Sequence, residues 1–472
     1  MSKTPTLIDK TGMGGVIALD GFDYQRWDAI CRIPGWLLNP TFEGLTIEAL
    51  EDFEARFFSP HSVHGHVLER FQAKSGALTR GSIVGVFEDF QRYDARYSGT
   101  TLMQTLVTPT LPSALQWIET NAGRIERARR FYQPFTGIIS ANDDAYRSKL
   151  EEAFPGSLGT FVANGANISL RNFTDYSSAS SVFANALNTA FQESDFGMRS
   201  ISALFDQLNH VFSNASGAMV DRQSLIEVLG SVLSSELLVK TSQPVRILSD
   251  AVHDVSDHIE IDARPFSGGP VAYPAPEMWG SDLAGPLEKT ANWLRTMGHS
   301  RVTLSGRYRL STGFAVGAAF RAAFGFEVEI PTRDGFWNTD THPVPRASYP
   351  EWTIEPSTQL VGDRLVVSIG VLRDPTSQVA KQFAIDETSQ ILRIFLSQAL
   401  TSGEDAQASV LDIKSAVSAA CVGLDARSID LFFVGPAALA VALGHRWNGM
   451  APTQFFEFVS GQGTYVPTIE VA

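Results

Sequence analysis

Residues 428–447, SIDLFFVGPAALAVALGHRW, begin as a mainly apolar strand, with Asp430 as its one charged residue, and continue as a helix of small residues. Gly435 and Pro436 separate the two, and proline is favoured in the first turn of a helix. The same alternation of apolar strands and helices runs twice through residues 256–472. Because continuous apolar strands alternating with helices are typical of parallel sheets covered on both faces, this region predicts two Rossmann-like α/β units in tandem. In such sheets, ligands bind at the carboxyl ends of the strands.

The individual elements follow from the hydrophobic periodicity. Strands are expected from residue 258 onward and at residues 301–311, 326–330, 364–372, 428–435 and 453–459. Helices are expected at residues 285–297, 314–325, 377–398, 407–421 and 436–447. The segment RDGFWNTD, residues 333–340, is expected to be a loop.

Composition and charge restrict the class of protein. The chain has 472 residues, and 44% of them are hydrophobic, which is enough to fill the cores of more than one domain. Its two cysteines, Cys31 and Cys421, cannot form a disulfide framework, so a reducing compartment is expected. No apolar run reaches about 18 residues, and we expect a cytoplasmic protein without a membrane segment. The net charge of −14 argues against coating of nucleic acid through global charge, although a local basic groove stays compatible with it.

Three segments are expected along the chain. Residues 1–150 mix helix and strand patterns and include a helix over residues 21–38. Residues 151–255 are mainly helical, and the pattern leaves open whether they complete the first domain or form a separate connector. Residues 256–472 hold the two α/β units.

The N-terminal strands carry a candidate metal site. Strands are expected over residues 44–58 and 67–76, joined by a loop of hairpin character. Because side chains alternate between the two faces of a strand, Gln72 and Lys74 share one face. If the strands pair, Asp52 converges with them on that face. A carboxylate and an amide oxygen suit Mg²⁺, and the lysine can stabilise developing negative charge. A strand end that is merely solvated by these polar side chains is the alternative.

Two further clusters are less specific. The arginine-rich run NAGRIERARRFYQP, residues 121–134, suggests either phosphate contact or, more commonly, a solvated helix face. The run HSVHGH, residues 61–66, holds three histidines but lacks a nearby carboxylate or cysteine partner. A polar loop is therefore favoured over a zinc site.

The motifs GGVIALDGFDYQ, IEALEDF and FQAKSG occur in this order near the N-terminus. This pattern resembles the PD-(D/E)XK nuclease superfamily, in its variant with Gln in place of the second acid, as in the double-stranded DNA endonuclease domain of certain bacterial anti-phage effectors. The resemblance implies a restriction-endonuclease-like α/β fold, with Asp52 and Gln72 as metal ligands and Lys74 as the catalytic lysine. It also implies Glu48 and Gln25 as further site residues. The implied cofactor is Mg²⁺, with Mn²⁺ as a substitute, and the implied substrate is double-stranded DNA.

Candidate ligand-binding residues lie at strand ends of the C-terminal region. Arg307 and Arg309 end a predicted strand, and Ser311 can cap the following helix, whose N-terminus favours phosphate. Two exposed arginines on a turn are the alternative. Phe336 and Trp337 could stack on bases or form a hydrophobic plug. The second unit adds candidates at its own strand ends: Thr376, Ser377, Lys381, Gly435 and Pro436.

Four motifs then appear in order over more than 200 residues: GRYRLSTGFAVGAAF, RDGFW, IDLFFVGPAALAVALGHRW and EFVSGQGTYVPTIEVA. They resemble the SAVED domain, a fusion of two CARF-like units that senses cyclic oligonucleotides in CBASS anti-phage systems. The combination of the two resemblances is similar to CBASS endonuclease effectors. It implies a cyclic oligonucleotide ligand, with a trinucleotide favoured over a dinucleotide, and ligand-driven oligomerisation that licenses DNA cleavage.

Three alternatives stay open at this point. The chain could be a regulatory binding protein with an inactive nuclease-like scaffold, or its nuclease could act on RNA or single strands. An NAD-linked enzyme is a weaker possibility, because the chain lacks the GxGxxG fingerprint and the acid that would bind the ribose.

Overall fold

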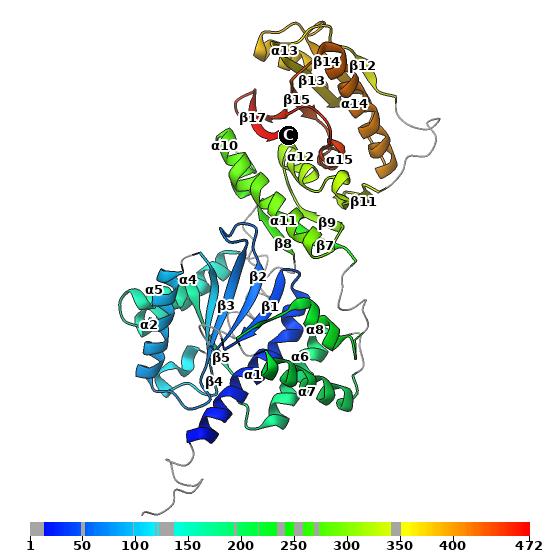
Figure 1. The fold of residues 1–472 in the computed structure, drawn as a ribbon. Coiled ribbons are helices and arrows are strands. Elements are labelled where there is room, and N and C mark those ends of the chain that lie inside the picture. The colour runs from blue at the N-terminus through cyan, green and yellow to red at the C-terminus, as the bar shows by residue number, and fades with distance from the viewer. Residues whose placement is uncertain are drawn as a thin grey trace, which may run out of the picture. The chain divides into compact units, whose positions relative to one another are not determined.

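The computed structural model describes residues 14–48, 52–97, 99–118, 120–121, 136–192, 196–215, 217–233, 241–249, 258–268, 273–340 and 351–472. The chain divides into two compact units, Met1–Val239 and Lys240–Ala472, and both are mixed α/β (Figure 1). The arginine-rich run of residues 121–134 lies, from residue 122 on, outside the described residues. In the described part of the chain, no helix has both the length and the apolar character needed to cross a membrane.

A six-stranded sheet forms the first unit. Its strands are β1 (Phe42–Ile47), β2 (Phe53–Phe58), β3 (His66–Ala73), β4 (Thr101–Thr108), β5 (Ala166–Leu170) and β6 (Met219–Asp221). Their spatial order is β5-β4-β3-β2-β1-β6. β1, β2 and β3 are antiparallel neighbours, β3, β4 and β5 run parallel, and β6 pairs antiparallel with β1.

Helices cover both faces of this sheet. One face carries α1 (Gly14–Leu38), α6 (Tyr176–Ala190), α7 (Met198–Asn214) and α8 (Arg222–Leu229). The other face carries α2 (Arg80–Arg96), α4 (Thr136–Ala153) and α5 (Ser157–Gly165). Leu106 and Val107, adjacent on β4, belong to the two separate cores, as alternation along a strand requires.

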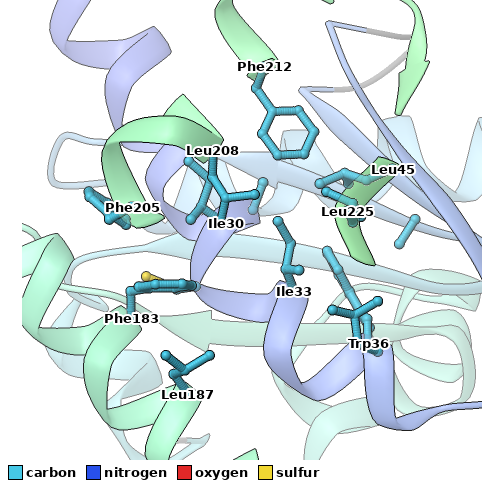
Figure 2. Close-up of a cluster of buried hydrophobic side chains, with 14 of the residues drawn as sticks. Ile30, Ile33, Trp36, Leu45, Phe183, Leu187, Phe205, Leu208, Phe212 and Leu225 are labelled. Atoms are coloured by element: carbon cyan, nitrogen blue, oxygen red, sulfur yellow. The ribbon is translucent and has the colours of Figure 1, made fainter. Parts of the chain in front are cut away.

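Helix α1 lies at the centre of the larger core, between the sheet and the later helices (Figure 2). It places Ile30, Ile33 and Trp36 in this core: Ile30 lies beside Leu208 of α7, and Trp36 packs against Phe42 and Phe71 of the sheet. Phe183 of α6 and Phe205 of α7 pack with ring centroids 5.5 Å apart. Residues far apart in sequence thus share one core, and the first unit folds as a whole.

One sequence expectation for this unit needs correction, and the structure bears on one question that the sequence left open. The single strand expected over residues 44–58 is two strands, because Glu48 adopts a left-handed backbone (φ 61°) and its N–H donates to the Asp52 carbonyl at 2.9 Å. The mainly helical segment 151–255 does not stand apart as a connector. Its strands β5 and β6 close both edges of the N-terminal sheet, and the boundary between units falls near residue 239.

The second unit contains two sheets. The first, of order β11-β10-β9-β7-β8, consists of β7 (Gln243–Leu248), β8 (Ile259–Asp262), β9 (Arg301–Gly306), β10 (Glu327–Thr332) and β11 (Gly335–Asn338). The second, of order β12-β14-β13-β15-β16-β17, consists of β12 (Thr353–Glu355), β13 (Arg364–Val371), β14 (Ile391–Leu396), β15 (Ser428–Val434), β16 (Thr453–Val459) and β17 (Thr464–Val471). Each has a parallel centre, which confirms the expected pair of Rossmann-like sheets.

The longer α-helices described in this unit are α11 (Gly285–Thr296), α12 (Leu310–Ala319), α13 (Thr376–Phe383), α14 (Gly403–Leu424) and α15 (Ala437–Arg446), and the short α10 (Pro276–Met278) precedes them. α12 follows the first sheet's β9 and α15 follows the second sheet's β15, and these two helices pack backbone to backbone. A Cβ on Gly317 would lie 2.0 Å from the Val441 carbonyl oxygen, and one on Gly444 would lie 2.1 Å from that of Phe314. Only glycine permits this approach, which joins the two α/β halves.

Several expected elements of the second unit differ from the structure. The helix expected over residues 377–398 ends at Phe383, because Ala384 turns left-handed (φ 54°), and the apolar segment after the turn forms β14. The expected loop RDGFWNTD contains β11, which pairs antiparallel with β10. Strand β9 ends at Gly306, earlier than expected, so Arg307 and Arg309 lie in the loop before α12. Strands β7 and β17 were not expected at all.

Candidate functional site

Asp52, Gln72 and Lys74 come together where β3 ends. Because β2 and β3 pair antiparallel, Asp52 is brought next to Gln72. The Asp52 Oδ2 atom accepts a hydrogen bond from the Ala73 N–H at 2.6 Å. This bond holds the carboxylate beside the segment that runs from Gln72 to Lys74, the arrangement that the strand pattern predicts.

Gln72 shows an unsatisfied polar atom at this position. Its Oε1 is buried and accepts no hydrogen bond from the described residues. Buried polar atoms are nearly always paired, and leaving one unpaired costs about 1–3 kcal/mol. An amide oxygen of this kind beside a carboxylate fits a hard cation that takes oxygen ligands, such as Mg²⁺. The described residues contain no group of three or more His, Cys, Asp or Glu that could hold a metal, so the donors here are one carboxylate and one amide oxygen.

The pKa of the Asp52 carboxyl is also consistent with a cation site. Burial raises the pKa of its carboxyl, and the Ala73 hydrogen bond and the Lys74 charge lower it without cancelling the effect. The pKa therefore stays above its ordinary value. A raised carboxyl pKa means that the surroundings do not fully stabilise the ionised form, so a cation placed here would favour ionisation.

Glu48 and Gln25 relate to this site in different ways. Glu48 is exposed and closes the turn between β1 and β2 through its backbone bond to Asp52. Gln25 lies half-buried on α1. Across the described part of the chain, no hydrogen bond or ion pair joins the Gln25 side chain to Asp52, Gln72 or Lys74. In the histidine-rich loop, His66 Nδ1 lies 3.1 Å from the backbone carbonyl oxygen of His64.

A buried ion pair lies on the same two strands, two residues from Asp52 on β2 and two residues from Gln72 on β3. The sequence pattern did not single it out. Arg70 Nε donates to Glu54 Oε1 at 3.0 Å, and Arg70 is only 3% exposed. Alternation places both side chains on the face of Asp52 and Gln72. Glu54 is thus paired with an arginine, which leaves Asp52 as the carboxylate that faces Gln72.

In the C-terminal unit, the start of α12 already holds an acid. The Glu457 carboxylate on β16 accepts hydrogen bonds from the N–H of Ser311 at 2.9 Å and from its hydroxyl at 2.7 Å. Ser311 is fully buried and Glu457 is 5% exposed. Burial raises the pKa of Glu457, although Ser311 and Arg309 lower it in part. The two Ser311 groups that the sequence offered to an anionic ligand therefore bind an internal carboxylate.

Tyrosines and arginines surround this acid. Arg309 is exposed, and its Nε donates to the Ser267 carbonyl. Burial, together with the charge of Glu457, raises the pKa of Tyr273 to about 12. Burial likewise raises the pKa of Tyr465 to about 12, and the Arg373 charge acts against it. Sequence reasoning missed Tyr273 and Tyr465, because isolated tyrosines carry no spacing signal. Arg307 is exposed in the same loop as Arg309.

The candidates on α13 serve the local fold to different degrees. Thr376 is buried, and its N–H and hydroxyl both donate to Asp374 Oδ1, at 3.0 and 2.6 Å. The hydroxyl of Ser377 donates to Glu387 at 2.8 Å. Lys381 is exposed in the last turn of the helix. The pKa of Asp374 lies below its ordinary value because the Thr376 and Arg393 hydrogen bonds outweigh its burial.

The remaining candidates lie on β11 and in the connection between β15 and α15. Phe336 is 61% exposed on β11, whereas Trp337, pointing to the other face, is 9% exposed and packs against Gly403 at the start of α14. Gly435 and Pro436 lie between β15 and α15, and Pro436 occupies the N-cap position without a side-chain cap. The close packing of α12 on α15 brings their first turns together, since a Cβ on Gly313 would lie 3.3 Å from the Ala437 carbonyl oxygen.

Comparisons with known proteins agree with this architecture. Residues 287–471 match the family model of SAVED, the SMODS-associated and fused to various effectors sensor domain. Along its length the chain is similar to two proteins called CD-NTase-associated protein 4. The one from Moraxella osloensis is 25% identical over 477 residues, and the one from Acinetobacter sp. (strain ATCC 27244 / 9458) is 24% identical over 474 residues; each alignment covers 99% of both chains.

Solved structures with the same fold cover both units. The Acinetobacter baumannii Cap4 SAVED/CARF-domain containing receptor with the cyclic trinucleotide 2′3′3′-cAAA matches with a TM-score of 0.76 at 21% identity, covering 95% of this chain and 98% of that chain. The Moraxella osloensis Cap4 receptor matches with a TM-score of 0.71 at 22% identity, covering 97% and 100%. The expected α/β fold class, with two Rossmann-like sheets in the C-terminal unit, is confirmed.

Proposed function

Because residues 287–471 match the SAVED family model, we propose that this chain is a metal-dependent nuclease that a cyclic oligonucleotide switches on. The C-terminal unit binds the messenger, and the N-terminal unit cleaves double-stranded DNA as part of anti-phage defence. The observation that carries the nuclease half is the buried, unpaired Oε1 of Gln72 beside the Asp52 carboxylate. Solved relatives that contain the cyclic trinucleotides 2′3′3′-cAAA and 3′3′3′-cAAA support a cyclic trinucleotide as the ligand class.

In this proposal, Asp52 and Gln72 hold Mg²⁺, and Mn²⁺ can replace it. When bound, such a cation would supply Lewis-acid polarisation of the phosphodiester and would lower the pKa of a coordinated water. The chain itself supplies the arrangement. The Ala73 N–H keeps Asp52 in place. Lys74, the residue that directly follows β3, contributes a positive charge where negative charge develops on the phosphate during hydrolysis of a P–O bond.

The sensor half uses the loops where the first turns of α12 and α15 meet. Arg307, Arg309 and Lys381 supply exposed positive charge for the phosphates of a cyclic trinucleotide, and Phe336 supplies an exposed ring for stacking. Gly435 and Pro436 belong to the same region, in the connection between β15 and α15. Ser311, Thr376, Ser377 and Trp337 support this region through their internal contacts.

Assembly links the two halves. A chain with net charge −14 has little general affinity for DNA, and several copies joined by ligand binding gain affinity through multivalency. A ligand that prefers the assembled state shifts the population toward it. The proposal fails at this step if a ligand-bound single copy, verified by light scattering, cuts DNA as fast as the assembly.

Plasmid cleavage in MgCl₂ tests the whole proposal. Wild type, Lys74→Ala and the control Lys149→Ala are compared with and without a panel of cyclic di- and trinucleotides. Lys149 is a suitable control because it lies in the same unit and contacts the Trp117 ring, with Nζ 4.6 Å from the centroid. Cleavage that needs one ligand, persists in Lys149→Ala and disappears in Lys74→Ala is the expected result. Ligand binding without cleavage of plasmid, single-stranded DNA or RNA would reduce the N-terminal unit to a scaffold.

A further inference from the structure

Arg32 lies at the centre of a buried polar network on the α1 face of the N-terminal sheet. Its Nε donates to Asp28 Oδ2 at 2.8 Å, and its Nη2 donates to the hydroxyl of Ser169 on β5 at 2.9 Å. Asp28 is fully buried and also accepts a hydrogen bond from Arg171 Nε at 3.1 Å. Asp28 is thus paired with two arginines and keeps one partner when the other is replaced. Arg32 also lies near the Glu69 carboxyl, whose pKa is raised by burial and lowered in part by the Arg32 charge.

The same guanidinium covers a ring of the central strand β3. The Arg32 Cζ atom lies 4.6 Å from the centroid of Phe71. Trp36 meets this ring edge-on, with centroids 5.7 Å apart, and Phe53 of β2 stacks on it at 4.5 Å with an interplanar angle of 9°. Phe71 is only 2% exposed. The ring is therefore held between a helix cation and the neighbouring strand.

This aromatic pair stands directly before the candidate site in the strand register. Phe53 faces Phe71 across β2 and β3, so Asp52 and Gln72 occupy the next positions along the two strands. Because successive side chains alternate, the aromatic pair points to α1, and Asp52 and Gln72 point to the other face. A one-residue slip would move every side chain of the strand to the wrong face. The Phe53–Phe71 stack thus fixes the register that brings Asp52 beside Gln72.

We propose that Arg32 is a positioning residue for the Asp52–Gln72–Lys74 site. Anchored by Asp28 and Ser169, it clamps Phe71 on Phe53 and so keeps the Asp52 carboxylate on the Ala73 N–H. Residues around position 170, which follow the nuclease-like motifs by about a hundred positions, thereby contribute to the geometry of the site. Where it concerns a metal site, this inference rests on the proposed function. The effect of Arg32 on the Asp52–Ala73 hydrogen bond can be tested without any cleavage assay.

Hydrogen exchange at the Ala73 amide tests the clamp in the full-length chain. Arg32→Gln removes the cation and leaves Asp28 paired with Arg171, and Phe71→Leu removes the ring while keeping an apolar side chain. Each change should speed Ala73 exchange roughly tenfold, a factor that the loss of a buried cation–π contact supports. Because both changes break the same contact, the double variant should exchange about as fast as either single one. Unchanged Ala73 exchange in Arg32→Gln, or fully additive effects, would overturn the inference.

Controls separate the clamp from general destabilisation and from the metal proposal. Arg56→Gln removes another arginine pair of the same sheet, with Glu43 at 2.7 Å, and should leave Ala73 exchange unchanged. If Arg32→Gln does not fold, Arg32→Lys keeps a charge for Asp28 but lacks the planar fork, and it should still speed exchange. Mn²⁺ binding, followed by electron paramagnetic resonance, should weaken about tenfold in Arg32→Gln. A wild type that binds no Mn²⁺, with Ala73 exchange still responding, would refute the metal site and leave the positioning inference standing.

Discussion

Ser311 and Glu457 link the two α/β halves of the C-terminal unit. Ser311 begins α12 in the first half, Glu457 lies on β16 in the second, and one carboxylate oxygen accepts both the N–H and the hydroxyl of the serine, at 2.9 and 2.7 Å. Helix N-termini favour anions, and this one is already served by an internal anion. A phosphate arriving near α12 would therefore meet a negative charge as well as the exposed arginines of the preceding loop.

Glu457→Gln is expected to strengthen binding of an anionic cyclic trinucleotide. The amide oxygen of Gln can still accept from Ser311, so the link between the halves persists, and only the repulsion is removed. Since charge effects at helix ends are worth about 0.3–1 kcal/mol, affinity should rise roughly two- to fivefold. Calorimetric titration with 2′3′3′-cAAA measures this change in affinity. Glu470→Gln, the same charge change at an exposed position of β17, should have a smaller effect. Equal or weaker binding in Glu457→Gln would show that the acid acts only as a structural anchor.

His445 is expected to make the C-terminal unit less stable as the pH falls. The imidazole is 1% exposed, Nδ1 lies against the Phe320 carbonyl oxygen, and burial lowers its pKa from 6.5 to about 4. Below pH 6.5 the unfolded chain takes up a proton that the folded chain refuses. Stability is thus complete above pH 6.5 and falls toward pH 4, by about 3 kcal/mol at most.

Denaturant unfolding from pH 4 to 7.5, compared between wild type and His445→Asn, measures this contribution. Asn can place an amide N–H near the Phe320 carbonyl but does not titrate, so the slope in this window should flatten. Buried Glu457 and Asp430 have raised pKa values and act with the opposite sign, since they favour the folded state at low pH. For this reason the difference between variants is the quantity to compare. His210→Asn, at an exposed position of α7, serves as the control, and an equal flattening there would contradict the assignment to His445.

The sequence predicted the parallel sheets and the meeting of Asp52 with Gln72 because both depend on local periodicity. Apolar strands between helices leave few alternatives, and alternation within β3 fixes which residues share a face. Other features depend on contacts between distant segments. The Glu48 turn splits one alternating run into two strands, and nothing in the hydrophobic pattern marks a single left-handed residue. The acid that meets Ser311 comes from 146 positions later, so no motif announces it.

The close packing of α12 against α15 is expected to be disrupted when Gly317 or Gly444 gains a methyl group. Gly317→Ala would place its Cβ 2.0 Å from the Val441 carbonyl oxygen, so the helices must separate. Overpacking of this kind costs about 1–3 kcal/mol or more, and ligand binding at the joined first turns should weaken with it. Thermal unfolding and trinucleotide titration measure the two effects. Gly423→Ala, on α14 with nothing within 4 Å of the added Cβ, should be neutral or stabilising. If Gly317→Ala and Gly423→Ala lost similar stability and affinity, the effect would not come from the contact between α12 and α15.

Gln72→Leu is expected to separate stability from function at the N-terminal site. The wild-type amide keeps a buried, unpaired oxygen, which costs about 1–3 kcal/mol, and an apolar side chain of similar size removes that cost. The melting temperature should therefore stay the same or rise, while Mn²⁺ binding and Mg²⁺-dependent plasmid cleavage are lost.

Gln104→Leu is the matched control for this change. Gln104 lies on the neighbouring strand β4 and also has an unpaired Oε1, but its Nε2 donates to the Phe90 carbonyl at 3.0 Å. Its replacement removes this hydrogen bond together with the unpaired oxygen, and it should leave Mn²⁺ binding intact. A Gln72→Leu variant that is less stable and still binds Mn²⁺ would contradict the prediction. The Gln72 amide would then stabilise the strand end and would not bind a cation, as the alternative of a solvated strand end requires.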